Sequence, residues 1–201
     1  MGRALCVFGD SIAYGKNDAI CGGWVGRLRI ELDSRERGID LHNCGISGNT
    51  TEDLLRRLGG ECAARGCEFL ILAIGINDAQ CIGSPDSPRF PVDRFRFRLE
   101  ALATIGRECS RRLAFLGLSA VDERRSSPAP WNPEKYYLAE RVELFDDQIR
   151  AMCDARALPF LPLRDALRPE HLSDGVHPNG AGHELLFRRV LSFLDATGFL
   201  D

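Results

Sequence analysis

Short apolar runs of strand length alternate along this chain with longer segments in which apolar residues recur at helical spacing. The runs cover residues 5–8, 40–43, 69–74, 113–118 and 158–162, and the helical segments lie near residues 24–37, 51–65, 92–112, 133–156 and 181–196. This βαβ alternation predicts an α/β fold, a parallel sheet covered by helices on both faces with right-handed crossovers. Ligands of such sheets bind outside the carboxyl ends of the strands.

The composition then sets the size and class of the protein. With 201 residues, of which 44% are hydrophobic and 27% charged, the chain is expected to form a single domain over residues 1–201. A formal net charge of -3 argues against nucleic acid as a partner, because phosphate backbones are bound by clustered Lys and Arg. The longest apolar stretches are far shorter than the ~20 residues of a membrane span. Since the N-terminus runs straight into the first predicted strand, without room for a signal peptide, we expect a cytoplasmic location; a mature secreted form without its leader would have the same sequence pattern.

Eight cysteines form an even set, as in small secreted proteins with disulfide bonds. Several of them lie inside predicted strands or helices, where a reduced cysteine packs as a small hydrophobe, so we expect reduced thiols. The chain has no Cys-x-x-Cys pair and no Cys/His grouping at zinc spacing. A metal site is therefore not indicated.

Three fragments carry the residue types of one nucleophilic active site. They are Gly9-Asp10-Ser11, Gly75-Ile76-Asn77-Asp78 and Asp174-Gly175-Val176-His177-Pro178. A serine hydroxyl becomes an effective nucleophile when an imidazole takes its proton, and the imidazole needs a carboxylate that fixes its tautomer. Ser11, His177 and Asp174 supply these groups, so the sequence predicts a serine hydrolase. We expect Asp10 and Asp78 to be structural, because a carboxylate in such a turn accepts backbone N–H groups.

Two segments rich in proline and serine, residues 79–91 and 119–133, leave the carboxyl ends of predicted strands. Loops at that edge commonly carry binding residues, so we expect them to form pocket walls; ordinary connections of uneven length are the alternative. Trp131, Tyr136 and Tyr137 would then line the acyl or alcohol pocket, with packing in the core or on the surface as the equal alternative.

Four blocks of the chain, in order, resemble the GDSL family of esterases and lipases, also called SGNH hydrolases. The blocks are Gly9-Asp10-Ser11 with Gly15 following, the run Asn-Cys-Gly-Ile-Ser-Gly-Asn-Thr at residues 43–50, Gly-x-Asn-Asp at residues 75–78, and Asp-x-x-His-Pro at residues 174–178. Each block alone is a weak signal, but four blocks in the order of the family are a strong one. Together they span most of the chain. The resemblance implies the three-layer α/β/α fold of the SGNH hydrolases, which is flavodoxin-like and has a central five-stranded parallel sheet.

The resemblance also implies a role for each block. Ser11 would be the nucleophile, with His177 and Asp174 completing a catalytic triad. The oxyanion hole would consist of the Ser11 N–H, the Gly48 N–H and the Asn77 side-chain amide.

Other interpretations of Gly48 and Asn77 stay open. Gly45 is a second candidate for the glycine donor, and Gly48 could instead serve only the turn before the helix at residue 51. Asn77 could instead cap a helix after the third strand, since asparagine is a favoured cap.

The function implied by the resemblance is a serine esterase that works through an acyl-enzyme and needs no cofactor. A chain of this length without a large cap favours small esters with short acyl or acetyl groups, and the expected pocket residues are Ile12, Ile76, Val176 and Trp131. Two alternatives are an acyltransferase with the same triad and a non-catalytic flavodoxin-like domain whose glycine-rich turns hold a phosphate. A partner-binding module has only the proline-rich loops in its favour.

Overall fold

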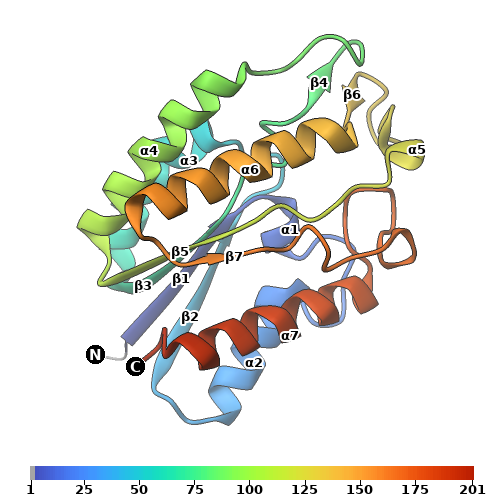
Figure 1. Cartoon of the computed structure of the whole chain (residues 1–201). Coiled ribbons are helices and arrows are strands. Elements are labelled where there is room, and N and C mark those ends of the chain that lie inside the picture. Colours follow the sequence, from blue (N-terminus) through green and yellow to red (C-terminus); the bar gives the residue numbers. More distant parts are fainter. Residues whose placement is uncertain (1–2) are drawn as a thin grey trace.

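The computed structural model describes residues 3–201 and contains the predicted sheet (Figure 1). Its five parallel strands have the order β2-β1-β3-β5-β7, and they are β1 (Arg3–Gly9), β2 (Ile39–Gly45), β3 (Cys67–Ala73), β5 (Arg112–Leu116) and β7 (Phe160–Leu161). The chain starts inside the sheet, moves to one edge and then crosses to the other. This confirms the flavodoxin-like order, whose switch point lies between β1 and β3.

Helices cover both faces of the sheet, so the molecule has three layers (Figure 1). α2 (Gly23–Ser34) and α7 (Gly180–Thr197) pack together on one face, and α3 (Thr51–Arg65), α4 (Val92–Cys109) and α6 (Ala139–Arg156) cover the other. In β1, Leu5 and Val7 belong to the core beneath α2 and α7, whereas Cys6 and Phe8 belong to the core beneath the other three helices. Because both faces of this strand are buried, its sequence is a continuous apolar run.

The segment near residues 133–156 differs from the predicted helix, because α6 begins only at Ala139. Before it lies a short strand, β6 (Lys135–Tyr136), which pairs antiparallel with β4 (Cys81–Ile82). The helix predicted over residues 92–112 likewise ends earlier, at Cys109. Three short pieces were not predicted: α1 (Ser11–Tyr14), α5 (Glu123–Ser126) and the 3₁₀ turn η1 (Pro169–His171). The β4–β6 pairing joins segments far apart in sequence, and no local periodicity reveals it.

All eight cysteines are free, and most of them are buried. Burial raises the pKa of the Cys153 thiol to about 12, so it stays a neutral hydrophobe. Among residues 3–201, no cluster of three or more His, Cys, Asp or Glu side chains is arranged to hold a metal ion. No helix in this described part of the chain is both long and apolar enough to cross a membrane.

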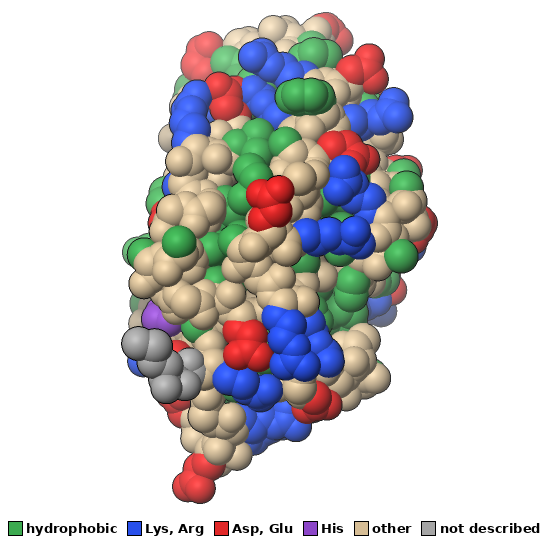
Figure 2. Space-filling view, turned by 90° about the vertical axis from the view of Figure 1, so that its left-hand side faces the viewer, with side chains coloured by type: hydrophobic (Ala, Val, Ile, Leu, Met, Phe, Trp, Pro, Cys, Tyr) green, Lys and Arg blue, Asp and Glu red, His purple; other side chains and the backbone are tan. Residues whose placement is uncertain are grey.

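Basic and acidic side chains are interspersed on the surface. Figure 2 shows one face on which Lys or Arg groups lie beside Asp or Glu groups, with apolar groups between them. Several arginines pair with an acid one helical turn away, such as Arg56 with Glu52 and Arg188 with Glu184. Exposed pairs of this kind contribute at most about 1 kcal/mol each to the free energy of unfolding. Their importance here is that most positive charge is neutralised locally.

Candidate active site

A tight turn places Ser11 at the carboxyl end of β1. Gly9 ends the strand, and a Cβ there would lie 2.5 Å from the carbonyl oxygen of Ala73 on β3, so only glycine fits. The Asp10 side chain caps α1 by accepting a hydrogen bond from Ile12 N at 2.9 Å. Ser11 is therefore the first residue of α1, close to the switch point of the sheet, and it is 5% exposed.

The C-terminal block brings His177 and Asp174 to Ser11. Ser11 Oγ lies 2.8 Å from His177 Nε2, and His177 Nδ1 lies 2.8 Å from Asp174 Oδ2. The other oxygen of Asp174 accepts the backbone N–H groups of His177 at 2.8 Å and Val176 at 3.1 Å. The three side chains thus form a continuous hydrogen-bonded chain of serine, imidazole and carboxylate, and the turn itself holds the carboxylate in place.

The electrostatics keep Asp174 ionised at neutral pH. Burial alone would raise the pKa of this carboxyl group, but the hydrogen bonds from the His177 side chain and backbone outweigh it and lower the pKa to about 2. An ionised Asp174 accepts the proton on Nδ1, which leaves Nε2 unprotonated toward Ser11. The His177 ring also packs against Trp131, with ring centroids 4.8 Å apart, and is 3% exposed. The imidazole is therefore fixed by the carboxylate, the serine and the indole.

Gly48 lies between β2 and α3 and borders the same cavity as Ser11. Its φ of 83° is in the left-handed region that favours glycine. Within residues 3–201, the N–H groups of Ser11 and Gly48 donate to no other group, so both are available to an oxyanion. Gly45 differs, because its N–H donates to Asn43 Oδ1 at 3.0 Å and a Cβ there would lie 2.4 Å from Tyr14 N. These contacts favour Gly48 over Gly45 as the glycine donor.

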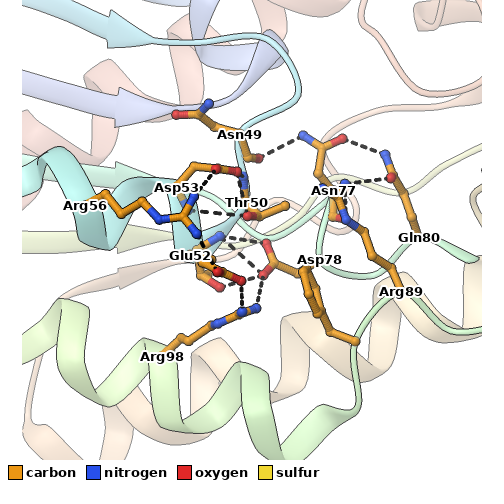
Figure 3. A network of polar contacts seen from close by, with 12 residues as sticks. Asn49, Thr50, Glu52, Asp53, Arg56, Asn77, Asp78, Gln80, Arg89 and Arg98 are labelled. Atoms are coloured by element: carbon orange, nitrogen blue, oxygen red, sulfur yellow. Dashed lines mark hydrogen bonds and ion pairs between the residues drawn. The ribbon is translucent and has the colours of Figure 1, made fainter.

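Asn77 lies in the turn after β3, and its neighbours fix the orientation of its amide (Figure 3). Its Oδ1 accepts from Gln80 Nε2 at 2.7 Å and from Tyr137 Oη at 3.0 Å, while its Nδ2 donates to the carbonyl oxygen of Asn49 at 3.0 Å. Gln80 is itself oriented by Arg89, whose Nη1 donates to Gln80 Oε1 at 3.0 Å. This leaves the second N–H of Nδ2 for the cavity. The turn continues into a loop and not into a helix, so Asn77 is not a helix cap.

Asp10 and Asp78 bind backbone groups, as expected for structural carboxylates. Asp78 accepts the N–H of Thr51 at 3.0 Å and its hydroxyl at 2.5 Å, at the first residue of α3 (Figure 3). Burial raises the pKa of Asp10 to about 7 and that of Asp78 to about 6. Because Asp78 ties the end of β3 to the start of α3, it holds the Asn77 turn next to the loop that contains Gly48.

A cavity of about 200 Å³ opens over the serine and the imidazole. Trp131, an expected pocket residue, forms part of its wall, and Tyr137 does so as well. Ile12 and Ile76 border a separate cavity of about 30 Å³, and Val176 is buried in the core. The structure therefore does not bring these three aliphatic side chains into the wall, which is largely polar and basic: Ser11, Lys16, Ser47, Gly48, Asn77, Trp131, Lys135, Tyr137 and His177.

The sequence analysis did not anticipate Lys16 and Lys135 in this wall, nor the support that Asn49, Gln80 and Arg89 give to Asn77. The rarity of lysine in the sequence could have drawn attention to these two positions, since the chain contains only two lysines. The three supporting residues had no such signal, because their role depends on contacts between separate loops. A wider open groove of about 700 Å³ adjoins the cavity and shares Lys16 with it.

Comparison of the chain with known proteins shows which family it belongs to. The model of the GDSL-like Lipase/Acylhydrolase family matches residues 7–185, a range that contains all four sequence blocks. A lipase/acylhydrolase from Enterococcus faecalis is 26% identical and has a TM-score of 0.77, with 97% of this chain and 96% of that chain covered. The acetylxylan esterase Axe2 from Geobacillus stearothermophilus is 23% identical and also has a TM-score of 0.77, with 96% and 94% covered.

The B. subtilis (strain 168) protein YpmR, named as uncharacterized, is 25% identical across 96% of this chain and 82% of its own length. The structural likenesses confirm the three-layer fold, and the family model confirms the resemblance seen in the four blocks. Since that model covers most of the sequence, the chain belongs to the GDSL-like lipase/acylhydrolase family and is a carboxylic ester hydrolase.

Proposed function

We propose that this chain is a single-domain serine esterase that hydrolyses esters with short acyl groups such as acetyl, through an acyl-enzyme on Ser11. The observation that carries the proposal is the pair of 2.8 Å contacts that link Ser11 Oγ to His177 Nε2 and His177 Nδ1 to Asp174 Oδ2. In Axe2, a serine-to-alanine and a histidine-to-alanine variant are catalytic mutants of that acetylxylan esterase, which supports the same division of roles here.

In the first step, Ser11 Oγ attacks the ester carbonyl carbon while His177 Nε2 takes the hydroxyl proton. The tetrahedral intermediate then collapses, the bond to the alcohol oxygen breaks, and His177 returns the proton to the leaving alcohol. In the second step, His177 takes a proton from water, the resulting hydroxide attacks the acyl carbon, and the proton returns to Ser11 as the acid leaves. Asp174 stabilises the imidazolium in both steps without taking the proton. The open, polar cavity admits water, which favours hydrolysis over transfer to another alcohol.

The oxyanion formed in each step would be bound by the N–H groups of Ser11 and Gly48 and by Asn77 Nδ2. The first two have no competing acceptor among residues 3–201, and the amide is held by Gln80 and Tyr137 before any substrate binds. Donors fixed in advance stabilise the developing charge without reorganisation.

Asn77→Ala should therefore lower kcat by about 100- to 1000-fold with a much smaller change in KM, because its hydrogen bond strengthens in the transition state. Steady-state kinetics on a p-nitrophenyl ester measure this split. Asn49→Ala is the matched control, since Asn49 contacts Asn77 through its backbone carbonyl, which the substitution keeps. A change confined to KM in Asn77→Ala would assign this residue to binding instead.

The short acyl preference rests on the size and polarity of the cavity. A long alkyl chain gains up to about 0.8 kcal/mol per buried CH₂, but only against an apolar wall. The cavity of about 200 Å³ over Ser11 is lined mainly by hydroxyl, amide, imidazole and ammonium groups. The adjoining groove of about 700 Å³ leaves room for a larger alcohol.

Hydrolysis of p-nitrophenyl acetate, butyrate and octanoate tests the proposal. We expect kcat/KM to be highest for acetate and at least about tenfold lower for octanoate, because the longer chain has no apolar surface to cover. The Ser11→Ala protein gives the background rate for each ester. A preference for octanoate would refute the short acyl assignment, and equal rates in both proteins would refute the role of Ser11.

A further inference from the structure

The two lysines of the chain both line the cavity over Ser11. Of 26 basic residues other than histidine, 24 are arginines and only Lys16 and Lys135 are lysines. They reach the same cavity from different elements, since Lys16 follows α1 and Lys135 lies in β6. A distribution by chance would scatter two lysines among the many basic positions of the surface. Their joint presence in a wall of nine residues points to a function of the site itself.

Lys16 lies close to the reacting groups, whereas Lys135 is placed by β6 in the same cavity wall. The backbone N–H of Lys16 donates to the carbonyl oxygen of Ser11 at 3.0 Å, and its carbonyl oxygen lies 3.0 Å from His183 Nε2. Its Nζ lies 4.9 Å from the centroid of the Trp131 ring, the same ring that packs on His177. The backbone of Lys16 is therefore anchored to the serine turn, and its ammonium group lies against the indole that packs on His177.

Lys135 lies near two other cations, Arg89 and Lys16. Burial, followed by the charges of Arg89 and Lys16, lowers the pKa of its ammonium group. Arg89 lies behind Asn77 and donates to Gln80 Oε1 at 3.0 Å. Two ammonium groups thus line a small cavity, and their mutual repulsion is relieved when a negative charge enters it.

Residues 3–201 provide no acidic ion-pair partner for either lysine. At least fifteen arginines form ion pairs with Asp or Glu, whereas neither lysine does so within residues 3–201. The nearby carboxylates are already engaged: Asp174 binds His177, and Asp10 and Asp78 bind backbone groups. The two ammonium groups are therefore available to a ligand.

We propose that the natural substrate is an anionic ester, whose carboxylate or phosphate group lies between Lys16 and Lys135 while its ester carbonyl meets Ser11. This inference rests on the proposed function and specifies its substrate class. A lysine suits this task because its ammonium is a compact charge on a flexible stem and follows an anion that shifts during the reaction. The cationic wall also raises the local concentration of an anionic substrate and speeds its association.

The test compares three aryl acetates with the same acyl group: 4-acetoxybenzoate, 4-acetoxyphenyl phosphate and the neutral methyl 4-acetoxybenzoate. The ratio of kcat/KM between an anionic and the neutral ester is measured in the wild type and in Lys16→Met, Lys135→Met and the double variant. Dividing the ratio of each variant by that of the wild type cancels the intrinsic reactivity of the esters. Methionine keeps an unbranched apolar stem of similar length without the charge.

We expect each single substitution to lower the anionic-to-neutral ratio by about tenfold and the double substitution by more, because each removes a charge-assisted hydrogen bond. Lys16→Arg and Lys135→Arg keep the charge and should retain most of the ratio. Arg96→Met removes one positive charge from an exposed position on α4 and should leave the ratio unchanged. The carboxylate and phosphate esters show which anion fits better.

An equal loss on neutral and anionic esters would overturn the proposal, since the lysines would then act on the oxyanion or merely hold Trp131. The proposed function would survive that result, because the wild type would still hydrolyse the neutral ester and Ser11→Ala would not. Calorimetry with Ser11→Ala gives a readout that needs no turnover. That protein should bind 4-acetoxybenzoate more tightly than its methyl ester, and equal binding would contradict the inference.

Discussion

Replacing Ser11 by alanine should lower kcat for p-nitrophenyl acetate by about 10⁴- to 10⁶-fold, and replacing His177 by alanine should cost a similar factor. The hydroxyl supplies the attacking oxygen, and the imidazole 2.8 Å away removes its proton, so neither group works without the other. The double variant should therefore be no more than a few-fold slower than either single variant. Initial rates at high enzyme concentration measure all three losses.

Two residues of the same types serve as controls. Ser47 borders the cavity without a histidine partner, and His171 binds the backbone N–H of Arg168 away from the cavity. Ser47→Ala and His171→Ala should keep most of the turnover. Labelling by an aryl fluorophosphonate, followed by mass spectrometry, should modify Ser11 alone in the wild type. Losses that multiply in the double variant would mean that Ser11 and His177 act independently, contrary to the proposed mechanism.

The fold could be predicted because both sides of the sheet are buried. The central strands then consist of short apolar runs, such as the one that forms β1, and the intervening helices show their own period. The error at residues 133–156 has a different origin. Lys135 and Tyr136 form β6 only because they pair with Cys81 and Ile82 more than fifty residues earlier, and such a contact leaves no periodic trace.

Some parts of the candidate site could likewise be predicted from local sequence, and other parts depend on contacts between distant segments. Local sequence marks Ser11, Gly48 and the C-terminal block. Asp10 caps the short helix that begins at Ser11, Gly48 has a positive φ, and Asp174 binds the backbone of His177 three residues later.

The residues that orient Asn77 come from three separate segments and meet only in the folded chain. Figure 3 shows two of them, Asn49 and Gln80, on either side of the amide. The cavity wall could not be inferred either. Ile12, Ile76 and Val176 pack elsewhere, and the wall instead contains Lys16, which directly follows the first block, and Lys135 from β6.

Asp174→Asn should lower kcat by about 10⁴-fold while the fold and KM stay close to those of the wild type. The asparagine Oδ1 can still accept the backbone N–H groups of Val176 and His177, so the turn is preserved. Its NH₂ group, however, would face His177 Nδ1 and donate to it. The imidazole proton then moves to Nε2, and His177 can no longer accept the proton of Ser11.

The ¹⁵N chemical shifts of the His177 ring report this change of tautomer directly, and steady-state kinetics report its consequence. Asn17→Ala is the matched control, because Asn17 Nδ2 donates to the same Asp174 Oδ2 at 3.4 Å but leaves the carboxylate ionised when it is removed. That variant should lose no more than a few-fold in kcat, since a long and exposed hydrogen bond contributes little. If Asp174→Asn changed the tautomer and turnover nevertheless persisted, His177 could not be the base. If instead the tautomer stayed the same while turnover fell, the negative charge of Asp174 would matter more than its control of the proton on Nδ1.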